Sequence, residues 1–272
     1  MNSPTNEKAY TINVRKFPRW NRVGLYKMIE KEVKRFASVY MQTVIAPVVT
    51  TCLFYVVFAL ALGGDERTMN GMPFMVFVVP GLIMMNMAQN AFANASSSLM
   101  ISKMQGSIVD VLMAPLSYVE VFLGYVIGAV LRALIIACAC IVVFALLLGI
   151  VPQDPLKLVA FGLLGATMLA VMGVLGGIWA DRFDNIAVVT NFVITPLTFL
   201  SGTFYSIEQL PEAWHAVAVF NPFFHMIDGF RSGMTGVGEV STGLSLTVLL
   251  VTNFILIATT LRVLKTGYKL KS

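Results

Sequence analysis

The sequence predicts an all-α integral membrane protein with six transmembrane helices. Hydrophobic residues make up 57% of the 272 residues and charged residues only 12%, and the mean hydropathy is +0.80. A soluble domain carries about twice that charged fraction. The chain has room for about six spans of ~20 residues with short connections. The apolar segments lie at about 39–62, 74–98, 118–149, 157–180, 185–202 and 243–263.

A basic amphipathic helix is predicted before the first span. Its apolar residues recur at helical spacing and share one face, namely Leu25, Met28, Ile29, Val33 and Phe36, while lysines, arginines and glutamates occupy the other. Trp20 and Tyr26 are suited to anchor such a helix at a membrane surface. We therefore expect residues 1–36 to form a cytoplasmic region with an interface helix, and residues 37–272 to form the transmembrane domain.

The positive charges predict the orientation. One side of the predicted topology holds the nine lysines and arginines up to Arg35, together with Lys103, Arg182, Arg262, Lys265, Lys269 and Lys271. The other side holds only Arg67, Lys157 and Arg231. Because short cytoplasmic loops carry an excess of positive charge, both termini are expected in the cytoplasm.

The stretch from Phe199 to Arg231, between spans five and six, is too apolar for a solvated linker. It is also interrupted too often for one helix, by Ser201, Gly202, Pro211, Asn221, Pro222 and Gly229. We expect a re-entrant helical segment that dips into the membrane from outside and also carries Asp228 and Arg231. An amphipathic hairpin lying on the membrane surface is the alternative.

The loop between spans two and three, residues 103–117, contains a short predicted helix. Ile108, Val111 and Leu112 form an apolar face, and Ala114-Pro115 ends the helix. A cytoplasmic helix with no partner in its own chain suggests a docking surface for a soluble protein. A short interfacial connector is the alternative.

Arg132 is the charge that falls deep inside a predicted span. An arginine at mid-bilayer is expected to face a partner or a wet cavity. Glu208 and Asp228 are the acidic partners best placed in a structural pair. In the alternative, Arg132 lines a translocation path and meets an anionic group such as a lipid phosphate. Aromatic residues near the spans, including Phe199, Phe204 and Tyr205, are candidates for the same path.

The sequence contains no motif typical of an enzyme. There is no Gly-x-x-x-x-Gly-Lys-Ser/Thr phosphate loop, and the two histidines, His215 and His225, lack a metal-ligand pattern. Cys52, Cys138 and Cys140 lie within apolar spans and are expected to be free core residues. We expect no cofactor, metal or nucleic acid bound by this chain. The Gly124/Gly128 and Gly173/Gly177 pairs permit close helix approach.

The stretch Phe199-Leu200-Ser201-Gly202-Thr203-Phe204-Tyr205, followed by Ile-x-x-Leu-Pro, Asn-Pro and Asp-Gly-x-Arg, resembles the C-terminal signature of ABC-2 type transporter permeases. Ser206 stands directly after Tyr205, where many members of that family have proline. The resemblance implies the permease subunit of a bacterial ATP-binding cassette exporter in the inner membrane. Such a subunit works as a homodimer with two separate ATPase subunits, which bind ATP and Mg²⁺, to move a lipid, glycan or amphiphilic drug outward.

Residues 103–117 are similar to the segment that joins the permease to the ATPase in that family. The resemblance assigns this coupling role to Gly106, Ser107, Ile108, Val111, Leu112, Ala114 and Pro115. Tyr125 stands where many members have lysine. An ATP-independent carrier or channel is the alternative function, but the spans contain almost no titratable groups for ion coupling. A non-transporting scaffold would leave the interrupted outward segment unexplained.

Overall fold

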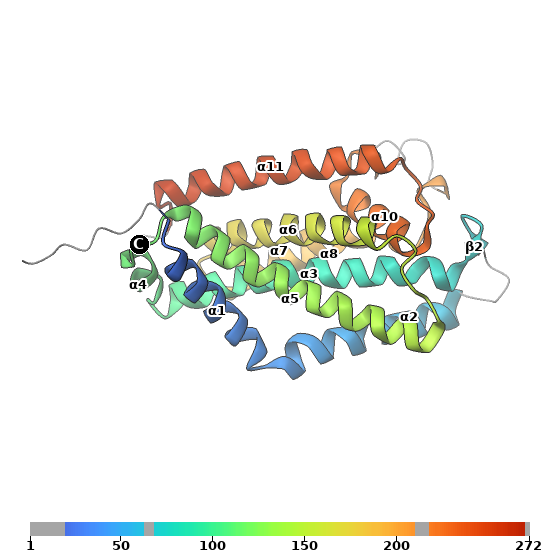
Figure 1. Ribbon diagram of the computed structural model, residues 1–272, viewed down its shortest axis with the longest axis horizontal. Coiled ribbons are helices and arrows are strands. Elements are labelled where there is room, and N and C mark those ends of the chain that lie inside the picture. Colours follow the sequence, from blue (N-terminus) through green and yellow to red (C-terminus); the bar gives the residue numbers. More distant parts are fainter. Residues whose placement is uncertain (1–19, 63–67, 210–217, 270–272) are drawn as a thin grey trace, which may run out of the picture.

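In the computed structural model the protein is an all-helical bundle (Figure 1). The structure describes residues 20–62, 68–209 and 218–269. Five helices within these ranges are long and apolar enough to cross a membrane. They are α2 (Ala46–Leu62) with the preceding π-helical turn η1 (Met41–Ile45), α3 (Phe74–Met104), α5 (Tyr118–Leu148), α6 (Pro155–Trp179) and α11 (Thr242–Thr266).

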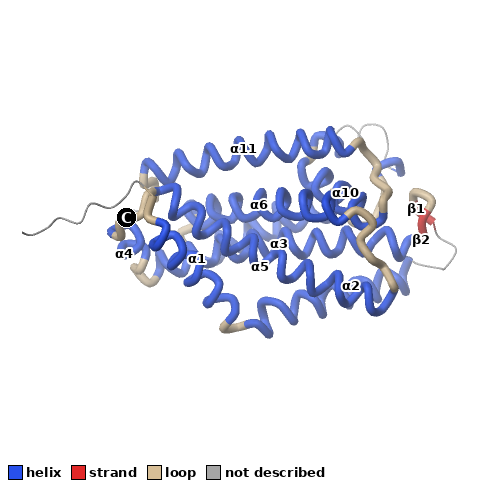
Figure 2. The backbone as a smooth tube through the Cα atoms, viewed as in Figure 1, coloured by secondary structure: helices blue, strands red, loops and turns tan. Residues whose placement is uncertain are grey.

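The remaining segments are shorter. The predicted fifth span corresponds to an apolar helix of 17 residues, Phe183–Phe199, built from α7 (Phe183–Val189), η2 (Thr190–Ile194) and α8 (Thr195–Phe199). The described residues also contain α1 (Arg22–Ala37), α4 (Ile108–Met113), η3 (Ile207–Gln209) and α10 (Pro222–Thr235). A small antiparallel hairpin joins α2 to α3, formed by β1 (Thr68–Met69) and β2 (Met72–Pro73) (Figure 2).

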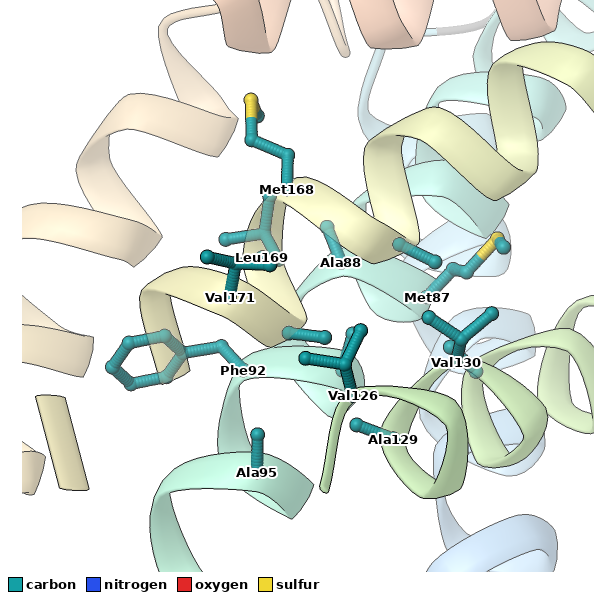
Figure 3. Close-up of a cluster of buried hydrophobic side chains, with 14 of the residues drawn as sticks. Met87, Ala88, Phe92, Ala95, Val126, Ala129, Val130, Met168, Leu169 and Val171 are labelled. Atoms are coloured by element: carbon teal, nitrogen blue, oxygen red, sulfur yellow. The ribbon is translucent and has the colours of Figure 1, made fainter. Parts of the chain in front are cut away.

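The centre of the bundle is formed by α3, α5 and α6, whose side chains interlock in the core (Figure 3). Small residues allow these helices to approach closely. A Cβ atom added at Gly173 would lie 2.5 Å from the carbonyl oxygen of Phe92, and one at Gly177 would lie 2.9 Å from that of Ser96. The close approach expected at this glycine pair is therefore confirmed as the contact of α6 with α3.

The second glycine pair, Gly124 and Gly128 on α5, allows α1 to approach α5 closely. A Cβ atom at Gly124 would lie 2.6 Å from the side chain of Met28, and one at Gly128 would lie 2.5 Å from that of Glu32. The amphipathic helix that the sequence predicts therefore packs directly on α5 along its apolar face, where Met28 and Phe36 are buried.

The loops divide between the two ends of the bundle (Figure 1). At one end, the Lys103 ammonium donates to the carbonyl oxygens of Ile178 and Ala180 at 2.9 and 2.7 Å. At the same end Lys269 pairs with Asp181 at 2.8 Å, and this hydrogen bond lowers the pKa of the Asp181 carboxyl. Helix α4 lies at this end, whereas the β hairpin and α10 lie at the other. The end of α3, the turn after α6 and the end of α11 thus lie together, and the charge pattern assigns all three to the same side of the membrane.

Candidate functional site

Helix α4 divides its apolar residues between the protein and the surroundings. Ile108 is buried, with 5% of its surface exposed, and Val111 packs against the core. Leu112 and Met113 are exposed by 42% and 80%, and Val109 is also exposed. The expected face of Ile108, Val111 and Leu112 is therefore wrong as a single docking surface, because the chain itself covers Ile108. The exposed apolar surface consists of Val109, Leu112 and Met113.

The turns before and after α4 are formed by residues that the sequence assigns to the loop 103–117. Gly106 has a φ of +71°, a left-handed conformation that favours glycine and lets the chain leave α3 sharply. Ser107 is the N-terminal boundary residue of α4, and Ala114 is extended directly before Pro115, which cannot continue the helix. The loop is therefore a defined helical turn between two long helices.

Glu120 fastens α1 to this end of the bundle. Ser117 and Glu120 form a capping box at the start of α5, in which the Glu120 carboxylate accepts from the Ser117 N–H at 2.7 Å. The other carboxylate oxygen accepts from the backbone N–H of Asn21, the N-cap of α1. The Asn21 side chain also donates to the carbonyl of Pro115 at 3.2 Å. One buried carboxylate thus joins α1, the α4–α5 loop and α5.

Helix α10 is anchored at the opposite end by buried charges. Arg231, 1% exposed, pairs with Glu239 at 3.4 Å and stacks on the Phe77 ring with its guanidinium carbon 3.7 Å from the centroid. It also donates to the carbonyl oxygens of Phe77 and Gly202. Asp228 accepts from the backbone N–H of Glu239 at 2.8 Å. This ionic network fixes α10 against α3 and against the loop before α11.

The start of α10 follows the pattern of its sequence. Asn221 is the N-cap, its side chain accepts from the Phe223 N–H at 3.0 Å, and Pro222 occupies the first turn. The Asn221 amide also donates to Ser201 at 2.9 Å, beside Gly202, whose φ is +74°. The predicted residue Pro211 lies outside the described residues.

Arg132 does not meet Asp228, one of the two partners expected from the sequence. Its guanidinium donates to the side-chain oxygens of Asn90 at 2.8 Å and Asn94 at 3.3 Å, both on α3. Asp228 instead satisfies backbone groups near α10, so the proposed pair with Arg132 is wrong. The Glu208 side chain lies outside the described part of the structure. Arg132 thus belongs to a contact between α5 and α3.

The aromatic candidates lie farther along the same side of α3. Phe204 stacks on Phe58 of α2 with ring centroids 4.1 Å apart and contacts Phe199 at 5.2 Å. Phe199, Phe204 and Tyr205 pack against a core cluster that includes Leu82 and Met85.

An open cavity of about 280 Å³ lies between α2 and α3. Its apolar lining includes Leu82 and Met85, and its polar lining includes Asn86, Gln89 and Asn90. Asn90 also accepts the hydrogen bond from Arg132, so the cavity wall and the arginine are in contact through one side chain. The cavity thus borders Arg132 through Asn90, and it borders the aromatic cluster through Leu82 and Met85.

Comparison with known proteins identifies the architecture. The model of the family described as ABC-2 type transporter matches residues 24–235. The chain belongs to the ABC-2 type transporter family. The match begins in α1 and ends at the last residue of α10, so it includes α4, Arg132 and the α10 residues Asp228 and Arg231. The chain is therefore a membrane subunit of a transporter, as the resemblance implies.

Two curated relatives add detail. The chain is 39% identical to the inner membrane transport permease YadH of Escherichia coli K12 over 221 residues, which cover 80% of this chain and 85% of the relative. It is 34% identical to nodulation protein J of Rhizobium leguminosarum bv. viciae over 90 residues, about a third of each protein. Together with the apolar helices, these matches make this ABC-2 subunit a multi-pass protein of the bacterial inner membrane.

Sequence reasoning missed two sets of residues in this ABC-2 subunit. Glu120 has a local signal, the Ser117-x-x-Glu120 spacing of a capping box directly before an apolar run. Asn86, Asn90 and Asn94 also have one, because amides four residues apart in a span must share a helix face. The hydrogen bond that Glu120 accepts from the Asn21 N–H could not be predicted from the local sequence, because the two residues are 99 positions apart.

Proposed function

We propose that this chain is the permease subunit of an ATP-binding cassette exporter that moves a lipid, glycan or amphiphilic drug outward across the inner membrane. The observation that carries the proposal is the exposed apolar surface of α4, residues Val109, Leu112 and Met113, at the end of the bundle where α1 is clamped. Apolar side chains at a solvated end of a bundle are suited to contact a soluble partner. Family membership supports an ATPase as that partner.

The proposed assembly contains two copies of this chain and two ATPase subunits. ATP and Mg²⁺ would be bound by the ATPases, since this sequence lacks a phosphate loop. Helix α2 supports a second copy, because it is the least buried of the five long helices and exposes Leu53, Val57 and Leu60. The path would run along the α2–α3 cavity, with Arg132 and the Phe199, Phe204 and Tyr205 cluster at its two ends.

The proposed topology has six spans and both termini in the cytoplasm. The helix Phe183–Phe199 would be the fifth span, because 17 residues extend about 26 Å, close to the ~30 Å apolar thickness of a bilayer. The stretch from Phe199 to Arg231 would be re-entrant, and the burial of every residue from Phe223 to Thr235 in its described part supports this. Residues 1–36 would be the cytoplasmic N-terminal region and 37–272 the transmembrane domain.

ATPase closure would act on α4 and α1 together. The Glu120 carboxylate connects the N-terminus of α1 with the loop that follows α4, so a displacement of one is transmitted to the other. Helix α1 in turn packs on α5, which carries Arg132. This route would couple hydrolysis to a rearrangement beside the α2–α3 cavity.

The test is reconstitution with the ABC ATPase that co-purifies with the tagged chain from its native membranes. We expect vanadate-sensitive ATP hydrolysis and ATP-dependent movement of a labelled amphiphile in proteoliposomes. A chain that moves the amphiphile equally well without ATPase and ATP would instead be the alternative, an ATP-independent carrier or channel. A chain that associates with no ABC ATPase and moves nothing would contradict both functions.

A further inference from the structure

A polar face runs along the membrane-spanning part of α3. Asn86, Asn90, Asn94 and Ser98 are each four residues apart and therefore lie one above another on the helix. Asn86, Asn94 and Ser98 are buried, Asn94 completely. Asn90 donates to the backbone oxygen of Asn86 at 3.0 Å, and Ser98 donates to the buried carboxylate of Glu32 at 2.7 Å. This face receives polar side chains from α1 and α5.

Two arginines reach this face, and within the described part of the chain only one of them has a counter-ion. Arg35 of α1 pairs with Glu32 at 3.2 Å and donates to the Asn94 side-chain oxygen at 3.0 Å. Arg132 of α5 shares that oxygen at 3.3 Å and uses Asn90 at 2.8 Å. Within the described residues no carboxylate forms an ion pair with Arg132. The charge of Arg132 is thus solvated by neutral amides.

The hydrogen-bonding groups that remain in this cluster are donors. The Arg132 Nε and the Asn94 Nδ2 are both buried, and neither has a partner among the described residues. Buried donors without acceptors are costly, as is an unpaired charge in a membrane. A group that supplied negative charge and several acceptor oxygens would relieve both costs at once.

We propose that Arg132, Asn94 and Asn90 form an anion site for the phosphate or carboxylate head of an amphiphile. The site lies between α5 and α3 at membrane depth, because Arg132 is 14 residues after Tyr118, about 21 Å along α5. Leu131 and Ile135, the latter one turn from Arg132, are exposed apolar residues against which a chain could pack. Asn90 also lines the α2–α3 cavity, which therefore borders the cluster. The inference rests on the proposed export function and narrows its substrate to anionic amphiphiles.

The test measures binding to the full-length chain in neutral detergent at pH 8, without ATPase. The probe is dodecyl phosphate. Dodecyl maltoside, which has the same alkyl chain but an uncharged head group, is the control probe. We expect dodecyl phosphate to bind saturably and to raise the thermal unfolding midpoint, and added maltoside to do neither. Arg132→Gln should weaken binding roughly ten- to a hundredfold, which corresponds to the loss of a hydrogen bond to a charged group. Arg182→Gln, which removes the same charge from an exposed position, should bind like the parent.

A second variant keeps the test valid if Arg132→Gln unfolds. Asn90→Asp places a carboxylate where the amide oxygen now lies 2.8 Å from Arg132. This internal counter-ion should raise the unfolding midpoint and abolish the effect of dodecyl phosphate. Equal binding by the parent and Asn90→Asp, or no binding by the parent, would overturn the site.

Inorganic phosphate tests whether the site binds a free phosphate ion or the phosphate head group of an amphiphile. We expect no shift from it at concentrations where dodecyl phosphate saturates, since the site lies at membrane depth. An equal shift would overturn the assignment to an amphiphile. Because no ATPase is present, a negative result leaves the proposed ATP-driven export standing. Conversely, loss of the ATPase partner would leave the binding result unchanged.

Discussion

The carboxylate of Glu120 accepts a hydrogen bond from the backbone N–H of Asn21, 99 residues earlier in the chain. This contact makes the N-terminus of α1 and the start of α5 one unit, next to the loop that follows α4. An interface helix that was held only by its apolar face could slide on α5. With Glu120 in place, its position relative to α4 is defined.

Glu120→Ala should release the N-terminus of α1. It leaves the N–H groups of Asn21 and Ser117 and the Ser117 hydroxyl without this acceptor, at a cost of about 1–3 kcal/mol for each that stays buried. Hydrogen exchange should increase in residues 21–25 and at the start of α5. Ser117→Ala is the control, because it removes the cap alone, at about 1 kcal/mol, and leaves the bond to Asn21. Unchanged exchange at Asn21 in Glu120→Ala would contradict the clamp.

Leu112→Asp should separate the docking role of α4 from its folding role. Because Leu112 is exposed, the variant should unfold within about 0.5 kcal/mol of the parent, but its co-purification with the ATPase should decrease at least tenfold. Ile108→Asp buries a charge and should fail to fold.

Val151→Asp is the matched control for Leu112→Asp, because it adds the same charge at an exposed position of the loop between α5 and α6. This loop lies at the end of the bundle opposite to α4 (Figure 1). It should retain the ATPase. Full co-purification by Leu112→Asp, measured by quantitative pull-down from membranes, would leave α4 as a connector.

Arg231 and Glu239 should behave as a coupled buried pair. Arg231→Met leaves the Glu239 carboxylate buried without its cation, which costs about 3–5 kcal/mol. In a double-mutant cycle with Glu239→Gln, the double variant should be more stable than the sum of the single effects predicts. Lys157→Met removes a cation from the half-exposed pair with Asp154 and should cost less than about 1 kcal/mol. Strict additivity of the unfolding free energies would rule out the coupling.

Cysteine labelling tests the orientation. In a variant without Cys52, Cys138 and Cys140, Gln105→Cys should react with a membrane-impermeant maleimide only after lysis, and Val151→Cys should react in intact spheroplasts. Both positions are exposed. Gln105 lies between α3 and α4, and Val151 lies in the loop between α5 and α6 at the opposite end of the bundle (Figure 1). The reverse pattern would invert the assignment of every loop.

The sequence by itself determines the helices, because hydropathy and periodicity are local properties. All six predicted apolar segments are helical, the interface helix lies at Arg22–Ala37, and Asn221-Pro222 begins α10. The glycine spacing also indicates close approach, although not which helix approaches. These features depend on residues within a few turns of one another.

Only the tertiary structure decides the partners of the polar groups. Arg132 meets Asn90 and Asn94 rather than Asp228, Ile108 turns inward, and Arg231 reaches the carbonyl of Phe77, 154 residues away. Each outcome depends on how a helix is rotated about its axis and at which depth it packs. The summed contacts of several helices fix that rotation and depth, and no single segment of the sequence contains them.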